Sequence, residues 1–329
     1  MKKTHRHLKL LGLLLCLFVV VIGFVLLQQW EQRRNTASGG EADSLKKQML
    51  FNGRWYSPKD ELETVLVMGV DKYSSDEQAE SYLNTQQADF LMLLVIDREE
   101  ETCTALQLNR DTMTDIQILG VTGQPAGTFE GQLALAHTYG SGGKDSCINT
   151  VDVVSNLLYG QHIDHYMSLT MDAVARLNDL VGGVEVTIED DFSDVDETLI
   201  QGETVVLNGE QALHFVRSRQ NVDDGSNLSR MERQRTYITA LYEAVKDCSE
   251  ADEDFYADTM MEIADYLVSD LTVHQMSDLG EIIEAYGVSE IRTLEGEAVR
   301  GEEFMEFYVD ESALQQTVVE LFYELSKAE

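Results

Sequence analysis

The sequence predicts an α/β protein, built as a three-layer α/β/α sandwich in which a central mixed sheet is flanked by helices, with an additional N-terminal transmembrane helix. Two observations predict the sandwich. First, the sequence contains short apolar runs that end at Gly or Asp, a pattern typical of strands whose two faces are both covered. Second, these runs alternate along the chain with segments whose apolar residues have helical spacing. A third observation, an uninterrupted apolar run behind a basic N-terminus, predicts the membrane helix.

The apolar run extends from Leu10 to Leu27, close to the ~20 residues that a helix needs to cross a bilayer. The alternative to a membrane helix is a cleaved signal peptide, but the run is not followed by the small-residue cleavage site of such a peptide. Four basic residues precede it: Lys2, Lys3, Arg6 and Lys9. The positive-inside rule therefore predicts a single-pass cell-membrane protein with a cytoplasmic tail (1–9), a signal anchor (10–27), a linker (28–60) and an extracellular main domain (61–329).

The main domain contains a motif-bearing core (61–246) and an acidic C-terminal part (251–329). Apolar runs predict strands over residues 63–70 and 90–96, and a shorter alternating pattern predicts a third over residues 102–108. Residues 184–188 and 214–219 are also expected to be strands. Helical spacing predicts helices over residues 147–158, 171–180, 208–213 and 230–246, with Asn208 as the N-cap of the third. The C-terminal part is expected to be mostly helical, with a short strand near residues 289–292.

The charge of the chain narrows its possible partners. A net charge of −35 makes nucleic acid a poor partner, because nucleic-acid binding needs a basic surface. The sequence contains no P-loop glycine motif and no H-E-x-x-H motif, which argues against an NTPase and a zinc protease. Outside the apolar run, Cys103 and Cys147 are expected to border one site, either as a disulfide or as two small core residues.

Charged residues stand at the ends of the expected strands. Asp71 follows the first strand, Asp89 precedes the second, and Arg110 and Asp111 follow the third. Strand ends are where α/β proteins build ligand sites, although ordinary turns also place charged residues there.

Arg217 and Arg219 are two residues apart on the expected strand 214–219, so their side chains would share one face. Two adjacent guanidinium groups repel each other unless an anion lies between them, and their geometry matches phosphate. Pairing with Asp223 or Asp224 is the alternative.

A polar stripe follows on the expected helix 230–246, at Arg230, Arg233, Gln234 and Tyr237. A solvated helix face would also explain this stripe. Together with the strand-end residues, however, it gives the sequence carboxylates suited to Mg²⁺ and arginines suited to phosphate oxygens. Positioning and charge neutralisation of this kind are what phosphoryl transfer requires.

The order of these motifs resembles the LytR-CpsA-Psr family of cell-wall glycopolymer transferases. The resemblance covers roughly residues 60–245 and rests on the following segments: Val67-Met68-Gly69-Val70-Asp71, Ala88-Asp89-Phe90-Leu91-Met92-Leu93, Asn109-Arg110-Asp111-Thr112, Ala136-His137-Thr138-Tyr139-Gly140, Val181-Gly182-Gly183-Val184-Glu185-Val186, Leu207-Asn208-Gly209-Glu210-Gln211-Ala212-Leu213, Val216-Arg217-Ser218-Arg219 and Arg230-Met231-Glu232-Arg233-Gln234. Each segment is weakly specific, and the set is strongly so.

The resemblance implies an Mg²⁺-dependent phosphotransferase that moves a teichoic-acid- or capsule-like glycopolymer from a polyprenyl-pyrophosphate carrier, whose tail occupies an apolar pocket, to peptidoglycan. Asp71 and Asp89 would hold Mg²⁺, and one of them would act as base. Asp111 would orient Arg110. The remaining implied pyrophosphate-binding residues are Arg110, Arg217, Arg219, Arg230, Arg233 and Gln234.

The chain departs from the family pattern at three positions. Asn109 replaces a frequent Pro, Gln87 stands where a phosphate-facing Arg is common, and Arg235 replaces a second glutamine. The change at position 87 puts the rate and the donor in question. Two alternatives on the same fold are a non-catalytic polyprenyl-phosphate-binding envelope regulator and a pyrophosphate hydrolase.

Overall fold

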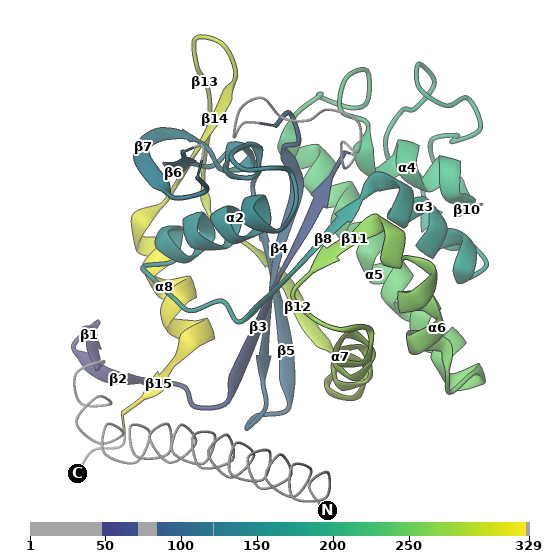
Figure 1. Cartoon of the computed structure of the whole chain (residues 1–329). Coiled ribbons are helices and arrows are strands. Elements are labelled where there is room, and N and C mark those ends of the chain that lie inside the picture. The colour runs from purple at the N-terminus through teal and green to yellow at the C-terminus, as the bar shows by residue number, and fades with distance from the viewer. Residues whose placement is uncertain (1–47, 72–83, 121, 327–329) are drawn as a thin grey trace, which may run out of the picture. The chain divides into compact units, whose positions relative to one another are not determined.

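The computed structural model describes residues 48–71, 84–120 and 122–326 (Figure 1). The chain divides into two compact units, of which the larger is Asp60–Phe322. The smaller unit contains a three-stranded antiparallel sheet of β1 (Met49–Phe51), β2 (Arg54–Pro58) and β15 (Tyr323–Leu325). Part of the segment expected to be a linker, 28–60, thus forms paired strands.

The expected tail (1–9) and signal anchor (10–27) lie outside the described residues. In the part of the chain that the structure describes, no helix has the length and apolarity to cross a membrane.

The larger unit is built on a six-stranded mixed sheet, which confirms the α/β fold class. Its strands lie in the order β11-β8-β3-β4-β5-β12. The pairs β3–β4, β4–β5 and β8–β11 are antiparallel, and the pairs β3–β8 and β5–β12 are parallel. The strand bounds are β3 (Leu62–Val70), β4 (Ala88–Asp97), β5 (Thr102–Leu108), β8 (His165–Thr170), β11 (Leu267–Ser269) and β12 (Val288–Thr293).

Helices cover both faces of this sheet (Figure 1). One face carries α2 (Lys144–Leu157) and α8 (Glu311–Phe322), and the other carries α3 (Met171–Leu180), α5 (Asn227–Ala251) and α7 (Val273–Tyr286). Because both faces are covered, β3 and β4 bury side chains that point in either direction. The unbroken apolar runs in the sequence reflect this two-sided burial.

Smaller elements complete the larger unit. Three two-stranded antiparallel sheets are formed by β6 (Met113–Leu119) with β7 (Pro125–Gln132), β9 (Val184–Thr187) with β10 (Thr204–Leu207), and β13 (Gly296–Arg300) with β14 (Met305–Val309). The short helices are η1 (Leu133–Thr138), α4 (Gly209–Arg217), α6 (Phe255–Glu262) and η2 (Ala264–Tyr266). The C-terminal part therefore contains the strand expected near 289–292, and also a β-hairpin that helical spacing did not predict.

The expected strand 214–219 is wrong, because residues up to Arg217 continue helix α4. Ala212, Phe215 and Val216 are buried at helical spacing, and Phe215 stacks on Phe192 with ring centroids 5.8 Å apart. The expected cap is confirmed, since Asn208 accepts a hydrogen bond from the backbone N–H of Gln211 at 3.0 Å. This packing outweighs the two-residue alternation of Val216 to Arg219.

The two buried thiols are free, so the structure shows core cysteines rather than a disulfide. Cys103 packs with Met276 and Leu279 of α7. Cys147 lies on α2, with its Sγ 3.8 Å from Nε2 of His137. Burial raises the pKa of Cys103 to about 11 and that of Cys147 to about 12.

Candidate functional site

Two carboxylates meet at one end of the central sheet. In the antiparallel pair β3–β4, Gly69 lies opposite Phe90 and Val70 lies opposite Ala88, with an irregularity between these pairs at Asp89. Asp71 is the next residue after β3. The register therefore brings Asp71 and Asp89 to the same sheet end, as the strand-end pattern in the sequence predicted.

Arg110 reaches this end from the neighbouring strand, because β5 pairs with β4 and ends just before it. Its guanidinium forms an ion pair with Asp89 and donates a hydrogen bond to the side-chain oxygen of Gln87. Its Nε lies 3.4 Å from Oδ1 of Asp111, which also accepts a hydrogen bond from Gln132 at 2.8 Å. Asp111 is thus placed to orient Arg110.

Arg230 approaches the same carboxylate from helix α5. Its Nη1 lies 3.9 Å from Oδ1 of Asp89, and its Nη2 donates to Oδ1 of Asn227 at 2.6 Å. Asn227 in turn donates to Oδ1 of Asn109 at 2.7 Å. Sequence reasoning missed Asn227, whose only signal was its place after the helix cap Ser226.

Arg217 and Arg219 also reach the cluster, although not as a pair on one strand face. Arg217, the last residue of α4, places Nη2 2.9 Å from Oδ1 of Asp71, and both side chains are at least half exposed. Arg219 lies two residues beyond the helix and is partly buried. Within the described residues, neither Asp223 nor Asp224 forms an ion pair with Arg217 or Arg219, and Asp224 accepts the backbone N–H of Ser226 at 2.7 Å.

The buried arginines repel one another. The pKa of Arg110 is lowered to about 10 by burial and by the nearby charges of Arg230 and Arg219, while Asp111 opposes the shift. Burial and Arg219 likewise lower the pKa of Arg230 to about 10. Burial raises the pKa of Asp111, against the pull of Arg110. A bound anion would relieve the repulsion between these guanidinium groups.

Arg233 and Gln234 were expected to bind the pyrophosphate directly, but their side chains contact the end of α4 instead. The guanidinium of Arg233 holds Asp190 at 2.6 Å, binds the backbone oxygens of Phe215 and Ser218, and lies over the ring of Phe192. Its contacts fasten the end of α4 to α5.

Gln234 donates to the backbone oxygen of Val216 at 3.2 Å and accepts from Gln107 at 3.1 Å. Both Arg233 and Gln234 therefore hold in place the turn that carries Arg217 and Arg219.

An apolar cavity of about 310 Å³ adjoins the cluster, between the sheet and helices α3, α5 and α7. Apart from Gln234, its lining is apolar or aromatic. Phe90 and Val216 line it, and their next neighbours in the chain are Asp89 and Arg217. The site thus combines an apolar cavity with a cationic end. The resemblance implied such a pocket, but the sequence alone did not locate it.

Comparison with known proteins places this geometry in a family. A relative named polyisoprenyl-teichoic acid–peptidoglycan teichoic acid transferase TagU, from Enterococcus faecalis, is 26% identical over 318 residues, which are 96% of this chain and 95% of the relative. Bacillus subtilis TagV has a solved structure with a TM-score of 0.59 and 24% identity, covering 80% of this chain and 97% of that one.

A structure of TagT bound to LIIa-WTA gives a TM-score of 0.57 at 23% identity and covers 79% of this chain and 89% of TagT. These structural likenesses concern the fold. The sequence itself matches the LytR_cpsA_psr family over residues 27–322, nearly the whole chain. The chain belongs to the LytR_cpsA_psr family.

Proposed function

We propose that this protein is a membrane-anchored phosphotransferase that moves a teichoic-acid- or capsule-like glycopolymer from a polyprenyl-pyrophosphate carrier to peptidoglycan. The observation that carries the proposal is the apolar cavity that adjoins a cluster of buried arginines. An apolar tail joined to an anionic head is the ligand that this combination fits. The family and the TagU relative, whose name describes such a transfer, support the same reading.

The donor would bind with its polyprenyl chain in the cavity and its pyrophosphate among Arg110, Arg217, Arg219 and Arg230. Burial has already removed much of the water from Arg110 and Arg230, so their contacts with phosphate are strengthened by the low local dielectric. Arg233 and Gln234 would act indirectly, by holding the turn that carries two of these arginines.

Asp71 and Asp89 form a donor set that fits Mg²⁺. They lie at one sheet end beside the arginines, and Mg²⁺ commonly takes one or two protein carboxylates together with phosphate oxygens. Bound there, the ion would neutralise charge on the pyrophosphate. The two ion pairs that these carboxylates now make, with Arg217 and Arg110, would then exchange for contacts to the ion and the phosphates.

The transfer forms a bond between an acceptor hydroxyl oxygen and the phosphorus that bears the glycan. The bond from that phosphorus to the bridging oxygen breaks, and polyprenyl phosphate leaves with the electron pair. The hydroxyl proton goes to a carboxylate. Asp71 suits this role better than Asp89, because it is half exposed and contacts one guanidinium, whereas Asp89 contacts two.

The reaction belongs outside the cytoplasm, where peptidoglycan lies. The basic N-terminus and the apolar run 10–27 support an anchor with the main domain outside. Protease added to protoplasts should then remove the main domain, and a protected domain would contradict this topology.

One assay separates transfer from the two alternatives. Purified full-length protein is given lipid-linked glycan, Mg²⁺ and peptidoglycan fragments. Ligated glycan supports the transferase, released glycan phosphate supports a hydrolase, and donor binding without either product supports a regulator. Omitting Mg²⁺, with chelator present, tests the metal separately; an unchanged rate would remove Mg²⁺ from the proposal.

A further inference from the structure

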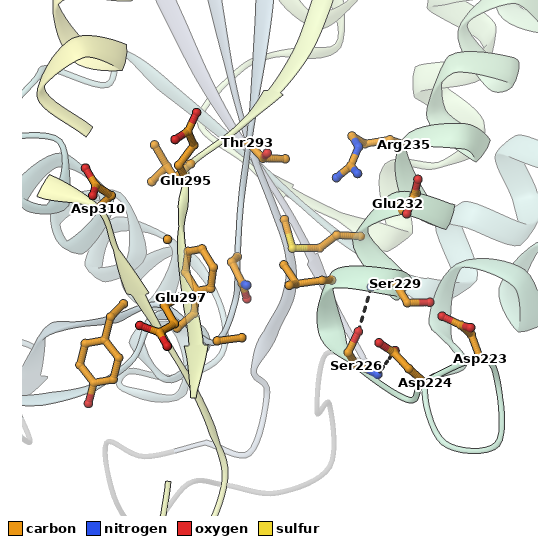
Figure 2. Close-up of a pocket in the computed structure, with 18 residues that line it drawn as sticks. Asp223, Asp224, Ser226, Ser229, Glu232, Arg235, Thr293, Glu295, Glu297 and Asp310 are labelled. Atoms are coloured by element: carbon orange, nitrogen blue, oxygen red, sulfur yellow. Dashed lines mark hydrogen bonds between the residues drawn. The ribbon is translucent and has the colours of Figure 1, made fainter. Parts of the chain in front are cut away.

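A second cleft, of about 1040 Å³, lies between the start of helix α5 and the β13–β14 hairpin (Figure 2). One wall comes from residues 223–235 and the other from residues 293–310, and Asn109 also lines it. None of its lining residues belongs to the apolar cavity, so it is a separate concavity.

The cleft carries a strong negative charge. Six carboxylates and one guanidinium, that of Arg235, line it, and Figure 2 shows the carboxylates divided between the two walls. Within the described residues, none of the six forms an ion pair with Lys, Arg or His. Asp224 accepts hydrogen bonds from Ser226, and Asp310 accepts one from the backbone N–H of Ala313. The acidic side chains are Asp223, Asp224, Glu232, Glu295, Glu297 and Asp310.

The arrangement of these carboxylates disfavours a single metal ion. Among the described residues, no three His, Cys, Asp or Glu side chains converge closely enough to hold one. Charges spread along two facing walls suit an extended ligand with positive groups at intervals.

The side chain of Asn109 supplies a hydrogen-bond donor at the cleft. Asn109 is only 4% exposed, and its Oδ1 accepts hydrogen bonds from the backbone N–H of Asp111 at 2.9 Å and from Asn227 at 2.7 Å. These two bonds fix the amide orientation and leave Nδ2 without a partner in the described residues. Because Asn109 lines the cleft and its Nδ2 is not enclosed by protein atoms, this N–H group can donate to a ligand or to water there. A ligand hydroxyl or carbonyl oxygen would satisfy it.

The cleft also offers apolar surface that suits sugar rings. Tyr308 and Leu228 are 45% and 46% exposed and stand on its two walls. The cleft is also linked to the arginine cluster, because Asn109 precedes Arg110 and Asn227 bonds both Asn109 and Arg230. A chain bound in this cleft would therefore lie next to the residues that hold the donor.

We propose that this cleft binds the acceptor, as a peptidoglycan strand bearing free, protonated amines. The inference rests on the proposed transferase function and goes beyond it, because it assigns the acceptor its own site and a charge preference. Hydroxyls of the strand would meet the Asn109 amide, its sugar rings would lie against Tyr308, and its ammonium groups would pair with the facing carboxylates.

The test is a binding titration with full-length protein, without donor and at a pH that keeps amines protonated. The probes are a glucosamine tetramer, its fully N-acetylated counterpart and trilysine. We expect the glucosamine tetramer to bind more tightly than the acetylated one, with affinity that falls as salt rises. Equal binding of the two tetramers would overturn the charge preference. Tighter binding of trilysine than of either sugar would overturn the role assigned to the sugar rings and assign the cleft to a cationic peptide.

The double variant Glu295→Gln/Glu297→Gln should weaken glucosamine-tetramer binding about tenfold, since two exposed ion pairs are lost. The matched control Glu302→Gln/Glu303→Gln changes two exposed carboxylates of the same hairpin that do not line the cleft, and should bind normally. An equal loss in both variants would reduce the effect to overall charge and refute the site.

Donor binding, measured on the same proteins, should be unchanged in both double variants. Failure of donor binding in the unaltered protein would count against the transferase proposal alone, and failure of probe binding would count against the acceptor cleft alone.

Discussion

The exposed ion pair between Arg217 and Asp71 allows the proposed pyrophosphate site to be tested with little risk to the fold. Arg217 is 59% exposed and Asp71 is 50% exposed, and their nearest side-chain atoms are 2.9 Å apart. Exposed pairs of this kind contribute only ~0–1 kcal/mol to stability. Arg217→Ala should therefore change the free energy of unfolding by no more than about 1 kcal/mol.

The same substitution should reduce transfer far more. Removing one preorganised donor to a charge that develops in the transition state costs on the order of 10²–10³ in rate. Arg217→Lys should recover only part of this loss, because an ammonium group cannot make the two-pronged contact of a guanidinium with phosphate. The measurement is the rate of glycan ligation at saturating Mg²⁺, with a thermal melt of each variant.

A matched control is available on helix α3. Arg176 forms an exposed ion pair with Glu262 at 2.5 Å, with exposures of 46% and 52%, and neither residue touches the site. Arg176→Ala should leave transfer unchanged. If Arg217→Ala is folded and ligates glycan at a rate near that of the unaltered protein, Arg217 does not contact the pyrophosphate and this part of the proposal is refuted.

Three further predictions concern buried groups. Arg110→Ala should lower the free energy of unfolding by about 3–5 kcal/mol, because it leaves the buried Asp111 without its counter-charge. In urea unfolding, the double variant Arg110→Ala/Asp111→Asn should recover part of this loss; equal stability of the single and the double variant would refute the pairing. Ile238→Trp should fill part of the apolar cavity and weaken donor binding ~tenfold or more while melting changes little, and undiminished affinity would place the lipid elsewhere. Cys103 and Cys147 should resist alkylation in the native protein at pH 8, since burial raises both thiol pKa values, and should react once it is unfolded; rapid native labelling would contradict their burial.

The sequence predicted the central strands and the meeting of their charged ends for a clear physical reason. Strands β3 and β4 are buried on both faces, so their apolar runs are continuous and stop where the sheet stops. Asp71 comes directly after the first run, Asp89 comes directly before the second, and Arg110 comes shortly after the end of β5. Antiparallel neighbours then bring the end of one strand beside the start of the next.

The strand assigned to Arg217 and Arg219 failed because two periodicities overlap in one short segment. Alternating residues from Val216 to Arg219 fit a strand, whereas the burial of Ala212, Phe215 and Val216 fits a helix. The capping box at Asn208, a local signal, begins that helix but does not say where it ends. The hydrogen bonds of Arg233 to the end of α4 are tertiary contacts, which local spacing cannot reveal.

The carboxylate cleft left no signal in the sequence, because its two walls lie about 60 residues or more apart in the chain and the protein is acidic throughout. Against a net charge of −35, a further Glu at position 295 or 297 carries no information until the hairpin folds against α5.

The clustered arginines, in contrast, stand out in such an acidic chain. A chain with 24 basic and 59 acidic residues nevertheless gathers Arg110, Arg219 and Arg230 closely enough to lower their neighbours' pKa values. Repulsion of this kind persists only where the fold imposes it.

Gln87 also affects the repulsion among these guanidinium groups. Its side-chain oxygen accepts a hydrogen bond from Arg110, at the position where the family resemblance led us to expect an arginine. A neutral acceptor there lessens the repulsion around Arg110, and it also removes one contact that a phosphate could have used. Under the proposed function, binding of the pyrophosphate would therefore depend more heavily on Arg217, at the end of α4, and on Arg219, just beyond it. For that reason, substitution of Arg217 or Arg219 should lower the rate of glycan ligation more in this protein than in a Gln87→Arg variant, and an equal loss in the two backgrounds would contradict this reasoning.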